Sequence, residues 1–204
     1  MIVIVDYRVG NIQAFLNVYK RLKIEATTAR DAGGLQGATR MILPGVGDFD
    51  QAMRRLDQSG MREALDELVL EKRVPVLGVC VGMQMLARSS DEGTLPGLGW
   101  VAGDVKSFRS LPCAETLPLP HMGWNDVRPV PGTRLFDQLE SEARFYFLHS
   151  YYFRCDQADD VIAVSSYGSE FCSAVGSENI FGVQFHPEKS HRWGTRLLRN
   201  FATL

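Results

Sequence analysis

The stretch VPVLGVCVGMQML, residues 74–86, leads an apolar run into a cysteine with a glycine two positions away on either side. The apolar residues at 74–79 favour a buried strand, and those after Cys80 favour a helix. A sharp strand-to-helix turn would push the Cys80 side chain out of the sheet, and Gly78 and Gly82 suit the crowding there. Free N–H groups of the helix would face the sulfur and favour the thiolate. The pattern predicts a nucleophile, although a buried strand with cysteine as a packing residue fits the same letters.

Outward from this stretch, the first half of the chain alternates strand and helix patterns. Strands are predicted at 2–6, 24–29, 40–43 and 74–79, a helix at 11–22, a Pro/Gly turn at 44–49 and an amphipathic region to about residue 72. From 101 to 183, short strands and turns predict antiparallel hairpins, at 145–153, 160–167 and 171–175. A buried strand at 180–185 and a surface helix at 191–201 follow. We therefore expect one α/β domain over residues 1–204, with a three-layer, open, mostly parallel sheet, flanking helices and antiparallel strands in the second half.

The composition argues against several classes of protein. The chain has 204 residues, 45% of them apolar, which is enough for one buried core. Its 22 basic and 24 acidic residues give a net charge of −2 without long runs, so we expect neither a nucleic-acid nor a membrane partner. The start MIVIVDY shows no leader pattern, and no apolar run reaches about 18 residues, so we expect a soluble cytoplasmic protein.

The spacing of cysteine and histidine gives no sign of a metal site or a cofactor. The four cysteines (Cys80, Cys113, Cys155 and Cys172) form no C-x-x-C pair, and the four histidines form no H-x-x-x-H pair. In a reducing compartment these cysteines are free thiols, and the last three have no assigned role beyond packing.

A base for the Cys80 thiol is predicted near the end of the chain. His186 follows the apolar segment 180–185 at the carboxyl edge of the predicted parallel sheet, where open α/β sheets bind their ligands. Pro187 would hold His186 extended, so that Glu188 points to the same side and reaches the imidazole. A histidine at a strand end is by itself more often structural, but with Cys80 and Glu188 it forms a candidate triad.

Motifs spread over nearly the whole chain resemble one known family. They are DYRVGN (6–11), LPGVGDF (43–49), GVCVGMQML (78–86), SSDEG (89–93), PGLGW (96–100), PHMGWN (120–125), FYFLHSYYF (145–153) and GVQFHPEKS (182–190). Together they resemble the class I, triad-type glutamine amidotransferases, which have a flavodoxin-like fold. Within that family they resemble the glutaminase subunits of imidazole glycerol phosphate synthase.

The resemblance implies hydrolysis of L-glutamine to glutamate and ammonia without a cofactor. The ammonia would pass to a cyclase-type synthase partner in a heterodimer. Cys80 would form a γ-glutamyl thioester, His186 would protonate the departing ammonia and then activate water, and Glu188 would orient His186. Backbone N–H groups of Val81 and Val46 would form the oxyanion hole.

The same resemblance assigns residues to a substrate pocket and a partner interface. The pocket would be lined by Gly47, Gln84, Glu92, His149, Ser150 and Tyr151. The interface and ammonia gate, where we expect the glutaminase to be switched on, would hold Asn11, His121, Trp124, Asn125 and Lys189. From residue type alone, Glu92 fits a solvated loop charge and Gln84 a polar helix residue better than substrate contacts, and Lys189 also fits a solvated charge. Trp124 equally fits a side chain buried under a hairpin.

Three features depart from the pattern of the histidine-pathway enzymes. Arg8 stands where the family usually has glycine, so it is strained if the site needs positive φ, or it adds charge to the interface. The segments 188–194 and 96–108 look more like paralogues encoded with surface-polysaccharide genes. The ammonia acceptor is therefore an intermediate of L-histidine biosynthesis, or else a sugar that gains an acetamidino group in O-antigen or lipopolysaccharide synthesis. A non-catalytic, partner-binding scaffold is a third interpretation, which the intact triad disfavours.

Overall fold

Strand β4 (Val76–Cys80), which carries the cysteine, lies inside the parallel part of a large sheet in this computed structural model, which describes residues 1–111, 117–139 and 142–204. The parallel part has the order β2-β1-β3-β4-β13. The other four strands are β1 (Ile2–Val5), β2 (Ala26–Ala29), β3 (Arg40–Gly45) and β13 (Ile180–Val183). Gly45 pairs with Cys80 and Val183 with Val79, so the loops after β3, β4 and β13 meet at one edge.

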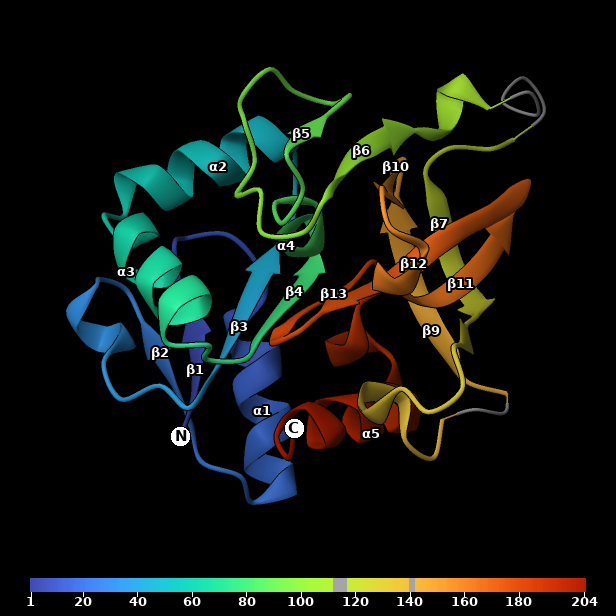
Figure 1. Ribbon diagram of the computed structural model, residues 1–204. Helices are drawn as coiled ribbons and strands as arrows, with labels where there is room; N and C mark the ends of the chain where they lie inside the picture. The colour runs from blue at the N-terminus through green and yellow to red at the C-terminus, as the bar shows by residue number, and fades with distance from the viewer. Residues whose placement is uncertain (112–116, 140–141) are drawn as a thin grey trace.

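Antiparallel strands extend the sheet beyond β13 (Figure 1). β12 (Ser169–Ser177) pairs with β13, β10 (Tyr151–Cys155) with β12, and β6 (Gly103–Ser107) with β10. The short β5 (Ser89–Ser90) runs parallel to β6, while β11 (Val161–Tyr167) pairs with β12 and with β8 (Arg128–Pro129). β7 (His121–Asp126) and β9 (Arg144–His149) form a separate antiparallel pair.

Helices cover both faces of the parallel strands (Figure 1). α1 (Ile12–Leu22) and α5 (His191–Phe201) pack together on one face. α2 (Phe49–Gln58), α3 (Arg62–Asp66) and the π-helical turn η2 (Glu67–Glu71) lie on the other face. Short 3-10 turns are η1 (Gly33–Leu35), η3 (Phe108–Ser110), η5 (Arg134–Phe136), η6 (Ala158–Asp160) and η7 (Pro187–Lys189). In the part of the chain that the structure describes, no helix is long and apolar enough to cross a membrane.

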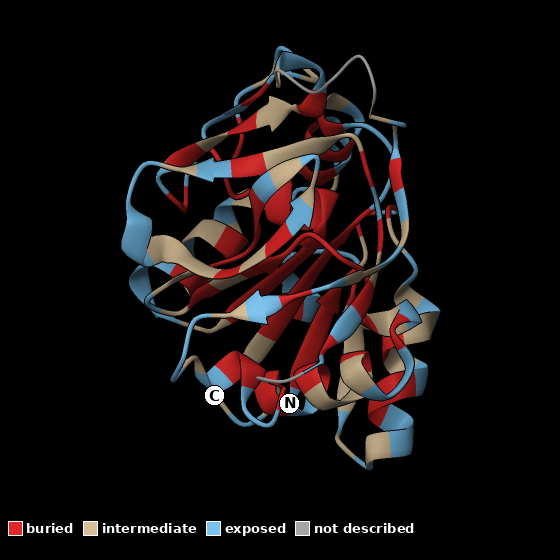
Figure 2. Ribbon diagram, turned by 90° about the vertical axis from the view of Figure 1, so that its right-hand side faces the viewer, coloured by how far each residue is buried: buried red, intermediate tan, exposed pale blue. Residues whose placement is uncertain are grey.

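The core follows the amphipathic pattern of these elements. All four residues of β1 are buried, as expected for a parallel strand covered on both faces. Phe15, Val18 and Tyr19 of α1 lie three or four positions apart and are buried together, as an amphipathic helix requires. Figure 2 shows buried residues concentrated along the central strands and exposed residues on the outer helix faces and loops. The predicted three-layer, mostly parallel α/β fold is confirmed.

The predicted strand at 145–153 divides into two strands in different sheets. β9 ends at His149 and pairs with β7, whereas β10 begins at Tyr151 and joins the large sheet. The carbonyl of the intervening Ser150 accepts a hydrogen bond of 3.1 Å from Phe108 N–H, just after β6. This contact continues the pairing of β6 with β10 by one position, so the chain changes sheets at Ser150, and local sequence patterns carry no sign of it. The hairpin expected at 160–167 and 171–175 is confirmed in β11 and β12.

The helix predicted after Cys80 is only a single turn, α4 (Val81–Gln84). The carbonyl of Met85 accepts a bond of 2.7 Å from Leu98 N–H, and that of Leu86 accepts one of 3.0 Å from Val101 N–H. The following loop thus takes the carbonyl groups that a longer helix would use. A full helix dipole is therefore absent at Cys80, and only the local N–H groups of the turn remain.

Candidate active site

Cys80 occupies a strained turn at the carboxyl end of β4. Its φ of 56° and ψ of −114° lie in a region that residues with a side chain rarely adopt. A Cβ on Gly78 would lie 2.6 Å from the Gly82 carbonyl oxygen, and a Cβ on Gly82 would lie 1.9 Å from the Leu43 carbonyl oxygen. Both glycines are therefore needed for this close backbone approach, which is the crowding that the Gly-x-Cys-x-Gly pattern predicts.

His186 reaches the cysteine from the loop after β13. It is 2% exposed and lines the same cavity as Cys80, close enough for Cys80 to influence its pKa. On its other side, His186 Nδ1 lies 2.9 Å from Glu188 Oε1. Glu188 lies on the 3-10 turn η7 rather than on an extended segment, so the predicted contact forms through a different backbone geometry. Ser190 Oγ holds this turn by donating to the His186 carbonyl at 2.6 Å and accepting from Tyr146 N–H at 3.0 Å.

The charge of His186 suits it to activate a thiol. Burial by itself lowers the pKa of His186, but the neighbouring Cys80 and the hydrogen-bonded Glu188 outweigh burial and raise the pKa to about 9. The imidazole is therefore protonated at neutral pH. An imidazolium beside a thiol favours the thiolate, which is the form that attacks a carbonyl carbon.

A cavity of about 290 Å³ adjoins this pair. Its lining residues are Val46, Gly47, Cys80, Val81, Gln84, Glu92, Pro120, Leu148, His149, Ser150, Tyr151, His186 and Lys189. The structure thus gathers every predicted substrate residue and both predicted oxyanion residues around Cys80 and His186. Glu188, with 2% of its side chain exposed, lies outside the lining and touches His186 from the protein side. The volume suits a small ligand such as an amino acid.

Gln84 and Glu92 are more constrained than solvated polar residues would be. Gln84 is buried, and its Nε2 donates to the Tyr151 carbonyl at 3.3 Å and to Gln184 Oε1 at 3.0 Å. Glu92 is half-buried, and its Oε2 accepts from Phe49 N–H at 2.9 Å at the start of α2. Burial, with smaller contributions from nearby carboxylates, raises the pKa of Glu92.

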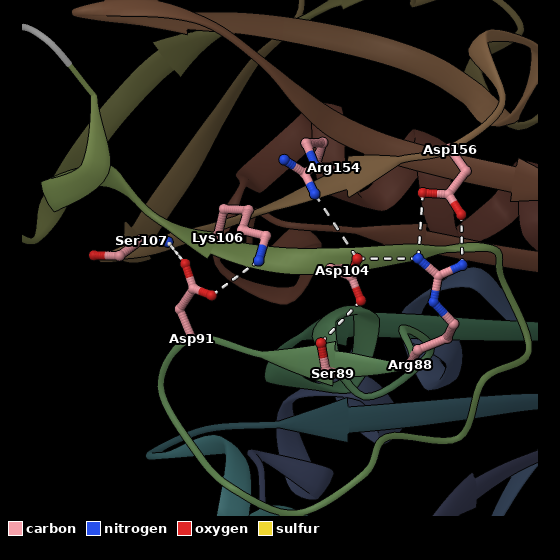
Figure 3. A network of polar contacts seen from close by, with 8 residues as sticks. All are labelled: Arg88, Ser89, Asp91, Asp104, Lys106, Ser107, Arg154 and Asp156. Atoms are coloured by element: carbon pink, nitrogen blue, oxygen red, sulfur yellow. Dashed lines mark hydrogen bonds and ion pairs between the residues drawn. The ribbon is translucent and has the colours of Figure 1, made fainter.

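The loop that carries Glu92 is fixed by polar contacts to β6 (Figure 3). Asp91 accepts from Lys106 Nζ at 3.0 Å and from Ser107 N–H at 3.1 Å. Further ion pairs among Arg88, Asp104, Arg154 and Asp156 join the residue before β5 to β6 and to the end of β10 (Figure 3). This side of the cavity therefore rests on side-chain contacts rather than on a long element.

Three of the residues expected at the partner interface are at least partly exposed. Lys189 lines the cavity, with its Nζ 5.8 Å from the ring centroid of Tyr146. Trp124 is 42% exposed rather than buried under a hairpin, and it stacks on His191 with ring centroids 5.3 Å apart. Asn11 is exposed and caps α1 by accepting a hydrogen bond from the N–H of its first turn at 3.3 Å.

The remaining two expected interface residues point inward. His121 is only 4% exposed, so its side chain lies inside the protein and does not form part of an open surface. Asn125 is half-buried, and its Nδ2 lies 3.2 Å from His121 Nε2. The alternation along β7 explains this, because His121 faces the aromatic interior while its neighbour Met122 faces outward.

Two residues that sequence patterns did not single out also contact the cysteine. Gln184 is fully buried, and its Nε2 lies 3.9 Å from Cys80 Sγ. A polar residue inside an apolar strand, two positions before His186, is a signal that points to it. The Leu148 carbonyl oxygen lies 3.8 Å from Cys80 Sγ, a backbone contact that no residue type can signal.

Other features of the chain lie apart from this site. A larger cavity of about 590 Å³ is lined by Asp6, Tyr7, Arg8, Arg30, Arg55, Gln58 and Ser59. Arg8 has a φ of 66°, which meets the positive-φ condition under which strain is predicted at this position. Cys155 and Cys172 are free thiols with Sγ atoms 4.0 Å apart on β10 and β12, and Cys113 lies outside the described residues.

A model of the family described as class-I glutamine amidotransferase matches residues 4–204. The chain belongs to the class I glutamine amidotransferases. This amidotransferase is 61% identical to the imidazole glycerol phosphate synthase subunit HisH of Bdellovibrio bacteriovorus. It is 52% identical to the subunit of the same name from Leptospira interrogans. Both comparisons cover the whole of this chain and the whole of the relative. Among solved structures, a glutamine amidotransferase superposes with a TM-score of 0.76 at 22% identity, covering 99% of both chains. The likeness to that structure supports the fold alone.

Proposed function

We propose that this amidotransferase, acting as a single domain, is the glutaminase subunit of an imidazole glycerol phosphate synthase. It hydrolyses L-glutamine to glutamate and passes the ammonia to a cyclase-type synthase partner in L-histidine biosynthesis. The observation that carries the proposal is the strained Cys80 in one cavity with a buried His186, whose Nδ1 lies 2.9 Å from Glu188 Oε1. The full-length HisH relatives support the pathway and the need for a partner.

The proposed reaction uses the triad in two steps. The Cys80 thiolate attacks the carboxamide carbon of glutamine, and the imidazolium of His186 gives its proton to the departing nitrogen as the C–N bond breaks. Ammonia leaves and a γ-glutamyl thioester remains on Cys80. Neutral His186 then takes a proton from water, the water oxygen attacks the thioester, and glutamate leaves as the C–S bond breaks. Glu188 stabilises the cationic ring in both steps through its contact with Nδ1.

The surrounding residues supply charge stabilisation and substrate contacts in this proposal. Backbone N–H groups of Val81 and Val46, at the start of α4 and in the loop after β3, would stabilise the oxyanion. Glu92 would hold the α-amino group, because it is the carboxylate in the cavity lining. Gln84 and the backbone of residues 149–151 would border the rest of the glutamine molecule.

A partner is supported by exposed apolar side chains around the cavity. Val46 and Leu148 line the cavity and are 41% and 38% exposed. Met122, 65% exposed, pairs with Leu148 across β7 and β9, and Trp124 lies two residues further along the same face of β7. Apolar groups gathered in this way mark protein interaction sites. We expect the synthase partner to cover them and to raise a low unassisted glutaminase rate.

The chemistry is tested by labelling with a diazoketone analogue of glutamine and by glutaminase assays with the synthase partner present. We expect Cys80→Ala to abolish labelling and to lower turnover at least about 10³-fold, because no other group replaces the nucleophile. Cys155→Ala is the matched control and should behave as the parent. Equal labelling of Cys80→Ala and the parent would contradict the assignment, and an unlabelled parent would favour a non-catalytic scaffold.

The ammonia acceptor is tested by genetic complementation. Growth of a histidine auxotroph that lacks its own glutaminase subunit supports the histidine pathway. Failure to grow despite good expression would favour the paralogues that amidate a surface sugar.

A further inference from the structure

A chain of four hydrogen bonds connects the second half of the sheet to the wall of the glutamine cavity. Asn125 Nδ2 lies 2.9 Å from the Ser166 carbonyl oxygen and 3.2 Å from His121 Nε2. His121 Nδ1 lies 2.9 Å from His149 Nε2, and His149 Nδ1 lies 2.7 Å from the Tyr151 carbonyl oxygen. This series of hydrogen bonds thus begins at Ser166 on β11 and ends at Tyr151 on β10, a residue that lines the cavity.

The carbonyl groups of Ser166 and Tyr151, at the two ends of this series, decide which ring nitrogens of the two histidines carry protons. A carbonyl oxygen only accepts, so Asn125 must direct its NH₂ group to Ser166, and His149 must carry its proton on Nδ1. The second Asn125 hydrogen points at His121 Nε2, which must therefore accept. His121 is then protonated on Nδ1 and donates to the bare Nε2 of His149. Both rings are neutral, which agrees with burial lowering the pKa of His121 to about 4 and of His149 to about 3.

The ring of His121 has little freedom to leave this arrangement. It lies between Phe147, with centroids 4.8 Å apart and planes at 25°, and Tyr167, with centroids 4.1 Å apart and planes at 22°. The side chain is 4% exposed. Stacking on both faces therefore holds the ring while its two nitrogens make directional bonds.

The last hydrogen bond of this series ends at a carbonyl group that also contacts a side chain of the cavity wall. The Tyr151 carbonyl accepts from His149 Nδ1 and also from Gln84 Nε2 at 3.3 Å, which uses both of its lone pairs. His149, Ser150, Tyr151 and Gln84 all line the cavity beside Cys80. We propose that His121 is a positioning residue that holds His149 in one tautomer and so fixes the Tyr151 carbonyl and the Gln84 amide at the glutamine-binding wall. This assignment of a role in substrate binding rests on the proposed glutaminase function.

The tautomers can be tested without any assay of activity. Nitrogen-15 NMR of the full chain labelled in histidine should show protonated Nδ1 and bare Nε2 for both His121 and His149 at pH 7. Either ring in the opposite tautomer, or charged, would overturn the proposal. Because this measurement needs no glutamine, its result is independent of whether the protein is a glutaminase.

The effect on binding is tested with a matched pair of variants at one position. His121→Asn keeps an N–H donor where Nδ1 lies, whereas His121→Leu has a similar shape and no donor. Saturation kinetics of Cys80 labelling by the diazoketone analogue separate binding from the reaction step. We expect His121→Leu to raise the half-saturation concentration about 5- to 10-fold, as loss of one buried hydrogen bond implies, with the limiting rate unchanged within about twofold. His121→Asn should stay within about threefold of the parent.

Two outcomes of this comparison would overturn the positioning role. One is equal half-saturation in His121→Leu and the parent. The other is an equal loss in both variants, which would indicate that ring packing alone matters. Thermal unfolding of each variant checks that it is folded, and if His121→Leu does not fold, the NMR result on the parent decides. An unlabelled parent protein would contradict the glutaminase function, while the tautomer measurement would still test the hydrogen-bonded chain.

Discussion

At the scale of single residues, the candidate site depends on a backbone conformation of Cys80 and a pKa of His186 that neither residue would have outside the folded protein. The backbone of Cys80 has a φ of 56°, a conformation that costs a residue with a side chain about 1–3 kcal/mol. His186 is 2% exposed and still has a raised pKa, because the neighbouring Cys80 and the hydrogen-bonded Glu188 outweigh the effect of burial. The rest of the fold must therefore stabilise both a strained turn and a buried charge, which is typical of functional sites.

The charge on His186 predicts how stability depends on pH. Its folded-state pKa of about 9 lies above the ordinary value of 6.5, so the folded protein holds this proton more tightly than the unfolded chain. The stabilising contribution is fully present below pH 6.5 and is lost as the pH rises through about 9. We expect the free energy of unfolding to fall by up to about 3 kcal/mol over that range. Urea unfolding at a series of pH values measures it, and an equally steep fall in His186→Asn would contradict the assignment.

At the scale of elements, the site exists because β3, β4 and α4 touch backbone to backbone. A Cβ on Gly45 would lie 2.2 Å from Gly82 N, so no side chain fits between the end of β3 and the first turn of α4. This contact brings the loop that carries Val46 against Val81. Both proposed oxyanion donors therefore lie beside the cysteine as a direct result of glycine packing.

This packing predicts a large loss of stability in Gly82→Ala. The new methyl group would lie 1.9 Å from the Leu43 carbonyl oxygen, so β3 and α4 would have to move apart. We expect a loss of about 2–3 kcal/mol in the free energy of unfolding, measured by urea denaturation. Gly33→Ala is the matched control, because its nearest atom is the end of an exposed side chain, Asp31 Oδ1 at 3.3 Å, and it should change stability by less than about 0.5 kcal/mol. A loss in Gly82→Ala no greater than in Gly33→Ala would refute this account of the turn.

At the scale of the whole molecule, the large sheet and the β7–β9 pair meet beside the cavity. The parallel strands supply the cysteine and histidine, while β9 and β10 supply the wall at residues 149–151. The apolar residues Val46, Met122, Trp124 and Leu148 lie at the same junction and are exposed in the single chain. The geometry therefore places the proposed interface next to the proposed chemistry, so that a bound partner could alter the cavity.

The proposed interface predicts that a double variant Met122→Ser, Trp124→Ser binds the synthase partner more weakly. We expect the dissociation constant to rise at least about tenfold, because an exposed tryptophan is a common anchor of such interfaces. Labelling of Cys80 in the isolated chain should be unchanged. Titration calorimetry measures the affinity, with Val130→Ser, another exposed apolar residue, as the control. Equal affinity of the double variant and the control would place the interface elsewhere.

The local sequence by itself determined the strand order along the chain, the turn at Cys80 and the candidate triad. Each depends on neighbours within a few positions: apolar periodicity for β1 and β4, glycines two residues from Cys80, and a carboxylate two residues from His186. The family resemblance added the substrate residues, all of which line the cavity.

Only the tertiary structure decided the split of residues 145–153 between two sheets, the single turn of α4, and which of the two alternating faces of β7, that of His121, is buried. These features depend on hydrogen bonds between segments far apart in sequence, such as Leu98 to Met85, Phe108 to Ser150 and His121 to His149. A local sequence pattern shows only which residues are apolar and how they repeat. Hydrogen bonds of this kind depend instead on which distant groups come within bonding distance in the folded protein. The turn at Cys80 is therefore encoded by thirteen adjacent residues, 74–86. The opposite wall of the cavity is instead formed by segments that come together only in the folded protein.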